Sequence, residues 1–119
     1  MKFCGIDIGG TKCAVTLGNK DGIAEKIKFG TTCVNETIGK IINAIENIGA
    51  ADAIGISCGG PLDSKNGVIM SPPNLPGWDN IEIVKMIEDK FSVPTGIEND
   101  ANACALAEWK FGAGRGVGN

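Results

Sequence analysis

The first thirty residues alternate between short apolar runs and tight turns. Residues 2–8 are mostly apolar, Gly-Gly-Thr-Lys follows at 9–12, and residues 13–17 alternate Cys, Ala, Val, Thr and Leu. Asn-Lys-Asp-Gly at 19–22 is a strong hairpin signal, because its glycine suits a position that needs a positive φ. Residues 23–29 predict a further strand. The pattern therefore predicts a three-stranded antiparallel meander.

The next stretch changes to helical spacing. A valine and several isoleucines recur every three or four residues, and Gly49 follows as a C-terminal cap. These apolar positions are Val34, Ile38, Ile41, Ile42, Ile45 and Ile48. Such a stripe predicts an amphipathic helix that packs against a sheet.

The middle of the chain combines a strand, a ribbon and a rigid loop. Residues 53–57 indicate a short buried strand, which Cys-Gly-Gly-Pro then ends. Residues 61–70 predict a ribbon that turns at Ser-Lys-Asn-Gly. Residues 71–77 contain three prolines and cannot form regular structure.

Two helices are expected in the last forty residues. The first begins at Asp79, with Glu82 as its capping-box partner and Trp78 stapled onto Ile83. Its buried stripe is Ile83, Val84, Ile87 and Phe91. A short strand within residues 93–98 precedes the second helix, which runs from about residue 100 to 111. The packing face expected for this helix consists of Ala101, Cys104, Ala105 and Ala107.

A meander followed by alternating helices and strands predicts an α/β fold. The order differs from that of a dinucleotide-binding fold, which begins strand–helix–strand. We expect residues 1–111 to form one lobe, whereas the glycine-rich residues 112–119 have no core-forming pattern. A chain of 119 residues is long enough to bury a core of its own.

Composition excludes several classes of protein. The net charge is -3, the 11 basic residues form no stripe and aromatic residues are sparse, which argues against binding to nucleic acid. No apolar run reaches membrane-spanning length, and the N-terminus lacks the layout of a signal peptide. We therefore expect a soluble, cytoplasmic protein with no membrane partner.

The cysteines and the absence of histidine narrow the possible chemistry. The five cysteines are scattered and form no C-x-x-C pair, so they are expected to be buried, reduced side chains. They are Cys4, Cys13, Cys33, Cys58 and Cys104. Without histidine, Ser-His and Cys-His nucleophiles are excluded from this chain, and acid–base chemistry must come from carboxylates or from another segment.

Residues 7–12, Asp-Ile-Gly-Gly-Thr-Lys, form the first candidate site. Gly9 and Gly10 allow backbone N–H groups to converge on an anion, Thr11 adds a hydroxyl donor and Lys12 adds a positive charge. Asp7 can help to hold Mg²⁺ beside phosphates, usually through water. The spacing differs from that of a P-loop. The alternative is an ordinary Gly-Gly hairpin turn beside an acidic residue.

Two glycine- and proline-rich segments are further candidates. Residues 55–63, Gly-Ile-Ser-Cys-Gly-Gly-Pro-Leu-Asp, place glycines where a ligand can approach a strand end, although a simple tight turn would look the same. Residues 71–78 hold Asn74 in a stiff loop. Its amide can both donate to and accept from a sugar hydroxyl, or it can merely satisfy the backbone.

Residues 98–103, Glu-Asn-Asp-Ala-Asn-Ala, join a strand to a helix. Asp100 suits the N-cap of that helix. It also suits a base that accepts a hydroxyl proton during phosphoryl transfer, because a helix N-terminus keeps a carboxylate ionised. Both roles are compatible.

Taken in this order, the four motifs resemble the ROK family of sugar kinases, repressors and uncharacterised open reading frames. The resemblance extends from residue 2 to about residue 116 and implies a ribonuclease-H-like lobe of the actin-like ATPase superfamily. It implies that Asp100 is the catalytic base. It also implies sugar contacts from Gly60, Asn74, Asn99 and Asp100, and a phosphate site at Asp7, Gly9, Gly10, Thr11 and Lys12.

The resemblance implies ATP and Mg²⁺ as cosubstrate and cofactor, and a hexose or hexosamine as substrate. Glucose is the common substrate in the family, while other members act on N-acetylmannosamine, fructose or allose. The family's second lobe carries the adenosine site, a second phosphate motif, sugar contacts and a structural zinc site. None of these is in this chain, which is therefore expected to be the N-terminal lobe and to be inactive alone. The full-length protein is expected to be a homo-oligomer.

Three functions follow as hypotheses. The first is an ATP-dependent, glucokinase-like sugar kinase, of which this is the N-terminal half. The second is a non-catalytic sugar sensor or regulator of the same family; the DNA-binding repressor form is disfavoured because the first strand begins at Lys2. The third is a structural α/β domain with glycine turns.

Overall fold

The computed structural model describes residues 2–19, 22–49, 51–99 and 103–111. The strands are β1 (Phe3–Ile8), β2 (Lys12–Asn19), β3 (Gly22–Gly30), β4 (Ala53–Cys58), β5 (Leu62–Asp63), β6 (Val68–Ile69) and β7 (Thr95–Glu98). The helices are α1 (Val34–Ile48), α2 (Ile83–Phe91) and α3 (Ala103–Phe111).

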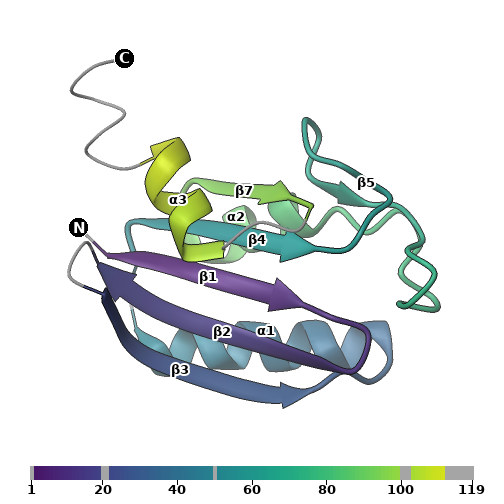
Figure 1. Ribbon diagram of the computed structural model, residues 1–119, viewed down its shortest axis with the longest axis horizontal. Coiled ribbons are helices and arrows are strands. Elements are labelled where there is room, and N and C mark those ends of the chain that lie inside the picture. Colours follow the sequence, from purple (N-terminus) through teal and green to yellow (C-terminus); the bar gives the residue numbers. More distant parts are fainter. Residues whose placement is uncertain (1, 20–21, 50, 100–102, 112–119) are drawn as a thin grey trace.

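A mixed sheet forms the centre of the molecule, in the order β3-β2-β1-β4-β7 (Figure 1). The first three strands pair antiparallel, as the sequence predicted. β4 and β7 then extend the sheet in parallel on the other side of β1. The predicted α/β class, a meander followed by alternating helices and strands, is confirmed.

The predicted turns and caps of the first half are also present. Gly22 ends its hairpin with φ at 130°, and Gly49 follows α1 with φ at 105°. The Gly49 N–H donates to the Ile45 carbonyl, which closes the last turn of the helix. The ribbon of β5 and β6 is held at its tip by Asp63, whose carboxylate accepts hydrogen bonds from the backbone and the side chain of Asn66.

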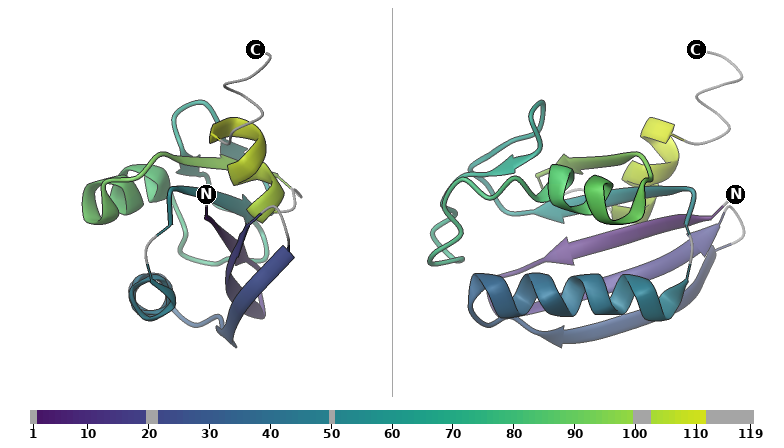
Figure 2. Two further views of the ribbon diagram at one scale, coloured as in Figure 1. Left: turned by 90° about the vertical axis from the view of Figure 1, so that its left-hand side faces the viewer. Right: turned by 180° about the vertical axis from the view of Figure 1, so that it is seen from behind.

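The two faces of the sheet differ because side chains alternate along each strand. α1 and α2 cover one face and α3 lies on the other (Figure 2). The α1 face is built from large apolar side chains that are almost fully buried. On the strands these are Cys4, Ile6, Ile8, Cys13, Val15, Leu17, Ile54, Ile56, Cys58 and Ile97. Each full burial of a large aliphatic side chain contributes about 1.5–3 kcal/mol, so this face holds the main core.

The α3 face carries small residues where the α1 face carries large ones. Gly5 on β1 pairs with Gly55 on β4, which pairs with Gly96 on β7, so a row of glycines crosses the sheet. A Cβ atom at Gly55 would lie 2.2 Å from the Ala103 carbonyl oxygen. One at Gly5 would lie 2.6 Å from the Cys104 amide nitrogen. The row therefore lets the backbone of α3 lie directly on the sheet, which a larger residue would prevent.

The predicted start of the second helix is wrong. α2 begins at Ile83, with Glu82 at its N-cap and no side-chain capping hydrogen bond, rather than at Asp79. The Asp79 carboxylate instead accepts a hydrogen bond of 2.5 Å from the Ser71 hydroxyl. Ile81 forms an isolated bridge with Ile69. These contacts keep residues 79–82 out of the helix and close the proline-rich loop, which the capping-box pattern does not reveal.

The packing face of α3 also differs from the prediction. Ala107 is buried as expected, but Ala105 is exposed, and Ala103 and Leu106 pack inward. Ala103, Leu106 and Ala107 lie three and four residues apart, so they share one face of α3. That face contacts the sheet at Gly55. The predicted helix start at Asp100, and Ala101, lie outside the described residues. Within the described ranges, no helix is both long and apolar enough to cross a membrane.

Candidate functional site

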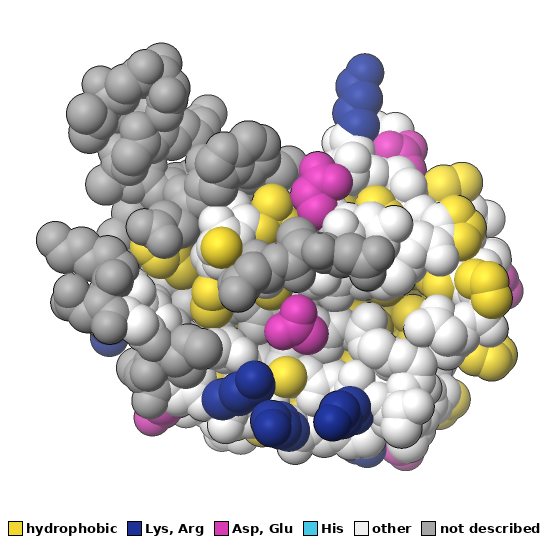
Figure 3. All heavy atoms as spheres, viewed as in Figure 1, with side chains coloured by type: hydrophobic (Ala, Val, Ile, Leu, Met, Phe, Trp, Pro, Cys, Tyr) yellow, Lys and Arg dark blue, Asp and Glu magenta, His cyan; other side chains and the backbone are white. Residues whose placement is uncertain are grey.

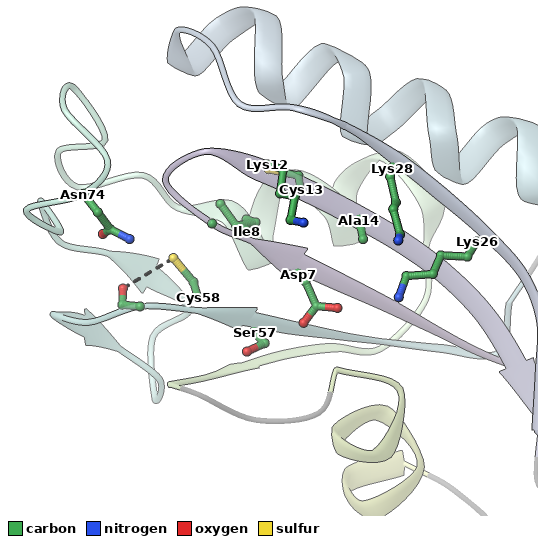
Figure 4. Close-up of a pocket in the computed structure, with 12 residues that line it drawn as sticks. Asp7, Ile8, Lys12, Cys13, Ala14, Lys26, Lys28, Ser57, Cys58 and Asn74 are labelled. Atoms are coloured by element: carbon green, nitrogen blue, oxygen red, sulfur yellow. Dashed lines mark hydrogen bonds between the residues drawn. The ribbon is translucent and has the colours of Figure 1, made fainter.

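The α3 face is hollowed beyond the end of the helix. α3 contacts β1 at Gly5, and two residues further along the strand a hollow of about 440 Å³ opens at Asp7. Its walls come from β1, β2, β3, β4 and the loop at Asn74 (Figure 4). Asp7, Gly9 and Lys12 of the first predicted motif line it together with Asn74 of the third. The tertiary structure thus brings two separate motifs into one site.

Asp7 lies in the middle of a row of side chains that crosses the sheet. Its register partners are Ala14 on β2 and Ser57 on β4. Lys28 continues the row beyond Ala14, and Glu98 continues it beyond Ser57. Because Ala14 and Ser57 are small, the carboxylate has open space on both sides.

The environment of Asp7 favours a bound cation. Partial burial in the hollow raises the pKa of this carboxyl, and the positive charge of Lys26 acts in the opposite direction. The side chain still reaches solvent. An ionised carboxylate that has lost part of its hydration gains from a nearby cation, so Asp7 is suited to hold one.

The turn from β1 to β2 is held by hydrogen bonds to its own backbone and to Thr31. The Gly9 N–H donates to the Lys12 carbonyl at 3.1 Å. The Thr31 hydroxyl donates to the Gly9 carbonyl at 2.7 Å, and the Thr31 N–H donates to the Thr11 carbonyl at 3.0 Å. The Gly9 N–H is thus engaged within the turn. Thr11 and Gly10 are exposed outside the lining of the hollow.

Asn74 is held in place by buried residues on the C-terminal side of its loop. Leu75 and Trp78 are each 1% exposed and anchor the loop in the core. The Ser71 N–H donates to the Trp78 carbonyl at 2.9 Å, which closes the loop at its base. The Asn74 side chain itself is exposed and points into the hollow (Figure 4). A rigid loop therefore presents one amide to a ligand.

The turn from β1 to β2 and the loop that carries Asn74 touch each other. A Cβ atom at Gly10 would lie 2.6 Å from the Asn74 carbonyl oxygen. A Cβ atom at Gly59 would lie 3.8 Å from the Asn74 side-chain oxygen. Gly10 is therefore required for the close approach of the two segments, whatever it contributes to a ligand.

Gly60 and Asn99 form a neighbouring pair. A Cβ atom at Gly60 would lie 3.1 Å from the Asn99 side-chain nitrogen, so these residues after β4 and β7 are adjacent. Neither residue lines the hollow at Asp7. Asp100, the predicted base, lies outside the described residues, so the structure does not relate it to Asp7.

Sequence reasoning missed Lys26 and Lys28 on β3, although both line the hollow. Figure 3 shows basic side chains gathered over the β2–β3 part of this face, near an acidic side chain. Two lysines separated by one residue on a predicted strand point to the same side, and that spacing was the available signal. Ser57 and Gly59, in the second glycine motif, also line the hollow.

The cysteines do not form a nucleophilic centre in this hollow. All five are free thiols, and Cys58, which lines the hollow, is buried. Burial, with a smaller contribution from Cys13, raises the pKa of Cys58 to about 11, so its thiol stays protonated at neutral pH. The prediction that all five are buried is wrong for Cys33, which is exposed, and Cys104 is only half-buried.

A metal ion held by the protein alone is not supported in the described part of the chain. Among those residues, no group of three or more acidic or cysteine side chains is placed to hold one. Asp7 offers a single carboxylate beside the turn. That arrangement fits Mg²⁺, which commonly keeps several waters and binds to one carboxylate together with a substrate's phosphates.

Known proteins match the chain over almost its full length. A glucokinase from Thermotoga maritima is 35% identical over 123 aligned residues, covering 98% of this chain and 39% of the relative. A putative fructokinase from Bacillus subtilis is 34% identical, covering 95% of this chain and 39% of the relative.

The solved structures agree with the sequence relatives. A ROK family glucokinase from Streptomyces griseus, solved in complex with glucose and AMPPNP, superposes with a TM-score of 0.76 at 30% identity. The match covers 98% of this chain and 38% of that structure, so the chain spans about two fifths of the proteins it resembles. The ROK family model matches residues 3–119. With this match and the shared fold, the chain belongs to the ROK family.

Proposed function

We propose that the chain is the N-terminal lobe of an ATP-dependent sugar kinase that phosphorylates a hexose or hexosamine. The observation that carries the proposal is the hollow in which Asp7, Lys12 and Asn74 meet on a ROK family fold. One side of it suits phosphates and Mg²⁺, and the other suits a sugar hydroxyl. The kinase relatives and the glucokinase bound to glucose and AMPPNP support the same pairing of ligands.

On the phosphate side, the turn from Gly9 to Lys12 would receive the donor's phosphates. Lys12 supplies positive charge at the edge of the hollow. Gly10 and Thr11 would donate from the exposed side of the turn, while Gly9 shapes it. Asp7 would hold Mg²⁺ through water, and the ion would offset charge on the transferring phosphoryl group.

On the sugar side, Asn74 would donate to and accept from a hydroxyl group. Gly60 lets the Asn99 amide lie close to the backbone after β4, and Asn99 would offer the sugar a second amide. Asp100 would accept the proton of the attacking hydroxyl as the phosphoryl group moves. Its position in the chain directly after Asn99 would place the base on the sugar side of the site.

The second lobe of the full-length protein would complete the site. It would supply the adenosine pocket, and its closure would hold donor and sugar in line while excluding water. Under this proposal, residues 1–111 are the lobe and residues 112–119 lead to its partner. A structural zinc site and the homo-oligomer contacts would belong to the rest of the protein, and the 119-residue chain alone would show no useful turnover.

The test uses the full-length protein with ATP, Mg²⁺ and a panel of hexoses and hexosamines. ADP release with one of the sugars is expected. Asp100→Asn should then lower kcat by at least about a hundredfold, the usual minimum for a general base. Asp89→Asn, on an exposed position of α2, is the matched control and should leave kcat unchanged.

The outcomes separate the hypotheses. Sugar binding without ADP release would overturn the kinase proposal in favour of a sugar sensor. Absence of sugar binding by calorimetry would favour a structural domain. ADP release that persists unchanged in Asp100→Asn would keep the kinase but remove Asp100 as its base.

A further inference from the structure

Lys26 and Lys28 project from β3 over the same hollow as Asp7. Their register partners on β2 are Thr16 and Ala14, which places both lysines on the α3 face of the sheet. Both side chains line the hollow, and Figure 4 shows them directed from β3 towards Asp7 on β1. The small side chain of Ala14 leaves the space between the strands open.

The charges in the hollow are not balanced. Lys12, Lys26 and Lys28 line it with Asp7 as the acidic residue. Among the described residues, ion pairs join Lys40 to Glu36 and Lys90 to Glu46, and the three lysines of the hollow take part in none. Like charges gathered around a partly enclosed space repel each other, and a bound anion relieves that repulsion.

The spacing of the lysines suits an extended anion rather than a single small one. Residues two apart on a strand are separated by about 7 Å, and β1 lies two strands from β3, about 10 Å away. The positive charges therefore cover a length on the order of a chain of several phosphates, from the turn at Lys12 to β3. Asp7 lies on β1, two strands from β3, and lines the same hollow, so a metal ion bound to such a chain would come within its reach.

We propose that Lys26 and Lys28 bind the phosphate chain of the phosphoryl donor and hold it over Asp7. This inference rests on the proposed kinase function, and it adds two donor-binding residues to the site. The phosphate chain could belong to a nucleoside triphosphate or to an inorganic polyphosphate, because both present the same linear phosphates with bound Mg²⁺. The lysines would recognise the phosphates that both donors share, independently of a nucleoside.

The experiment compares Lys26→Gln, Lys28→Gln and the double variant in the full-length protein. Calorimetric titration with AMPPNP and Mg²⁺, and separately with inorganic triphosphate and Mg²⁺, gives the dissociation constants. Each single substitution is expected to raise the dissociation constant for AMPPNP by about tenfold, because each removes a charge-assisted contact. The double variant should also show a weaker dependence of binding on salt.

Two controls separate donor binding from a structural role. Lys40→Gln makes the same charge change on α1, on the opposite side of the sheet, and should leave the dissociation constant unchanged. Lys26→Arg and Lys28→Arg should recover most of the lost affinity. In kinetic assays the KM for the donor should rise in the Gln variants while the KM for the sugar stays constant.

Unchanged AMPPNP affinity and salt dependence in the double variant, with its melting temperature preserved, would overturn the inference. If the Gln variants lose affinity for both inorganic triphosphate and AMPPNP, the inference is supported for polyphosphate and nucleotide donors alike. If the wild-type protein binds AMPPNP but not triphosphate, the inference is restricted to nucleotides. If the lysine effect on AMPPNP binding is present but no sugar is phosphorylated, the proposed kinase function fails while the binding role of the lysines stands.

Discussion

The two faces of one sheet have opposite designs. The α1 face interlocks isoleucines from the strands and the helix, and its members on the strands are almost fully buried. The α3 face carries Phe3 at one end of β1 but is otherwise lined mainly by glycine, alanine, serine and threonine, and α3 packs backbone to backbone over Gly5 and Gly55. The first arrangement supplies apolar burial, while the second leaves room for Asp7 and the lysines beside a close-packed helix.

The difference shows how one set of strands can carry a stable core on one face and, on the other, the hollow that we propose as the binding site. Alternation puts Ile6 on the core side and its neighbours Gly5 and Asp7 on the binding side. The core side can therefore be apolar without filling the hollow on the other face. Substitutions on the two faces should accordingly change the free energy of unfolding by different amounts and, at some positions, in opposite directions.

The largest expected effect on the free energy of unfolding comes from a substitution on the α1 face. Ile56→Ala removes a fully buried side chain from the middle of the sheet and should lower the free energy of unfolding by about 2–5 kcal/mol. Urea denaturation measures the change. Ile56→Val keeps most of the volume and should cost only about 0.5–1.5 kcal/mol. Equal losses for both variants would contradict tight packing on this face.

A smaller effect is expected from the addition of one methyl group to the α3 face. Gly55→Ala places a Cβ atom where the Ala103 carbonyl oxygen lies, so α3 must shift, at a cost of about 1–3 kcal/mol. Gly39→Ala is the matched control, because Gly39 lies within α1 with open space around it. That substitution should stabilise the protein by about 0.5–1 kcal/mol. If both substitutions changed the free energy of unfolding in the same direction, the close contact of α3 with the sheet would be refuted.

The smallest effect on stability is expected at Asp7. Burial holds the pKa of Asp7 above its ordinary value, so the ionised form destabilises the fold. The Asp7 carboxyl therefore contributes favourably to the free energy of unfolding when pH is below the ordinary aspartate pKa. This contribution is lost as pH rises through the raised pKa of the folded state. Asp7→Asn should therefore raise the free energy of unfolding at pH 7, by no more than about 0.5 kcal/mol for this solvent-exposed group.

The pH profile and the activity of Asp7→Asn complete this test. The stability gain should disappear at acid pH, where the wild-type carboxyl is neutral. Under the proposed function, the same variant of the full-length protein should lose at least about tenfold in kcat, since a bound metal ion contributes several kcal/mol to phosphoryl transfer. A variant that is less stable at pH 7 than the wild type would show that the carboxylate supports the fold rather than the ligand.

Much of the fold could be predicted because its signals are local. The apolar run of β1, the alternation in β2, the isoleucine spacing of α1 and the glycines at 22 and 49 are signals that depend on near neighbours in the chain. The start of α2 could not be predicted in this way. Asp79 has a capping-box pattern, but Ser71 and Ile69, about ten residues earlier, compete for this segment and delay the helix.

The candidate site likewise combines residues that local motifs reveal with residues that only strand pairing brings there. Asp7, Lys12 and Asn74, which line the hollow, could be named as candidates from their motifs, because glycine and proline mark turns and stiff loops in the sequence itself. Lys26 and Lys28 carry no motif. Their place beside Asp7 depends on the register of β3 with β2, a relation between strands that no local pattern reveals.

The sequence by itself determined the family, the class of fold and the glycine turn between β1 and β2, because these follow from motifs and from the periods of its strands and helices. Only the tertiary structure decided which motifs meet in one hollow, how closely α3 approaches the sheet and which side of β3 faces Asp7. The physical reason is that these relations are set by strand pairing and by packing between distant segments. Each depends on contacts that exist only when the chain is folded.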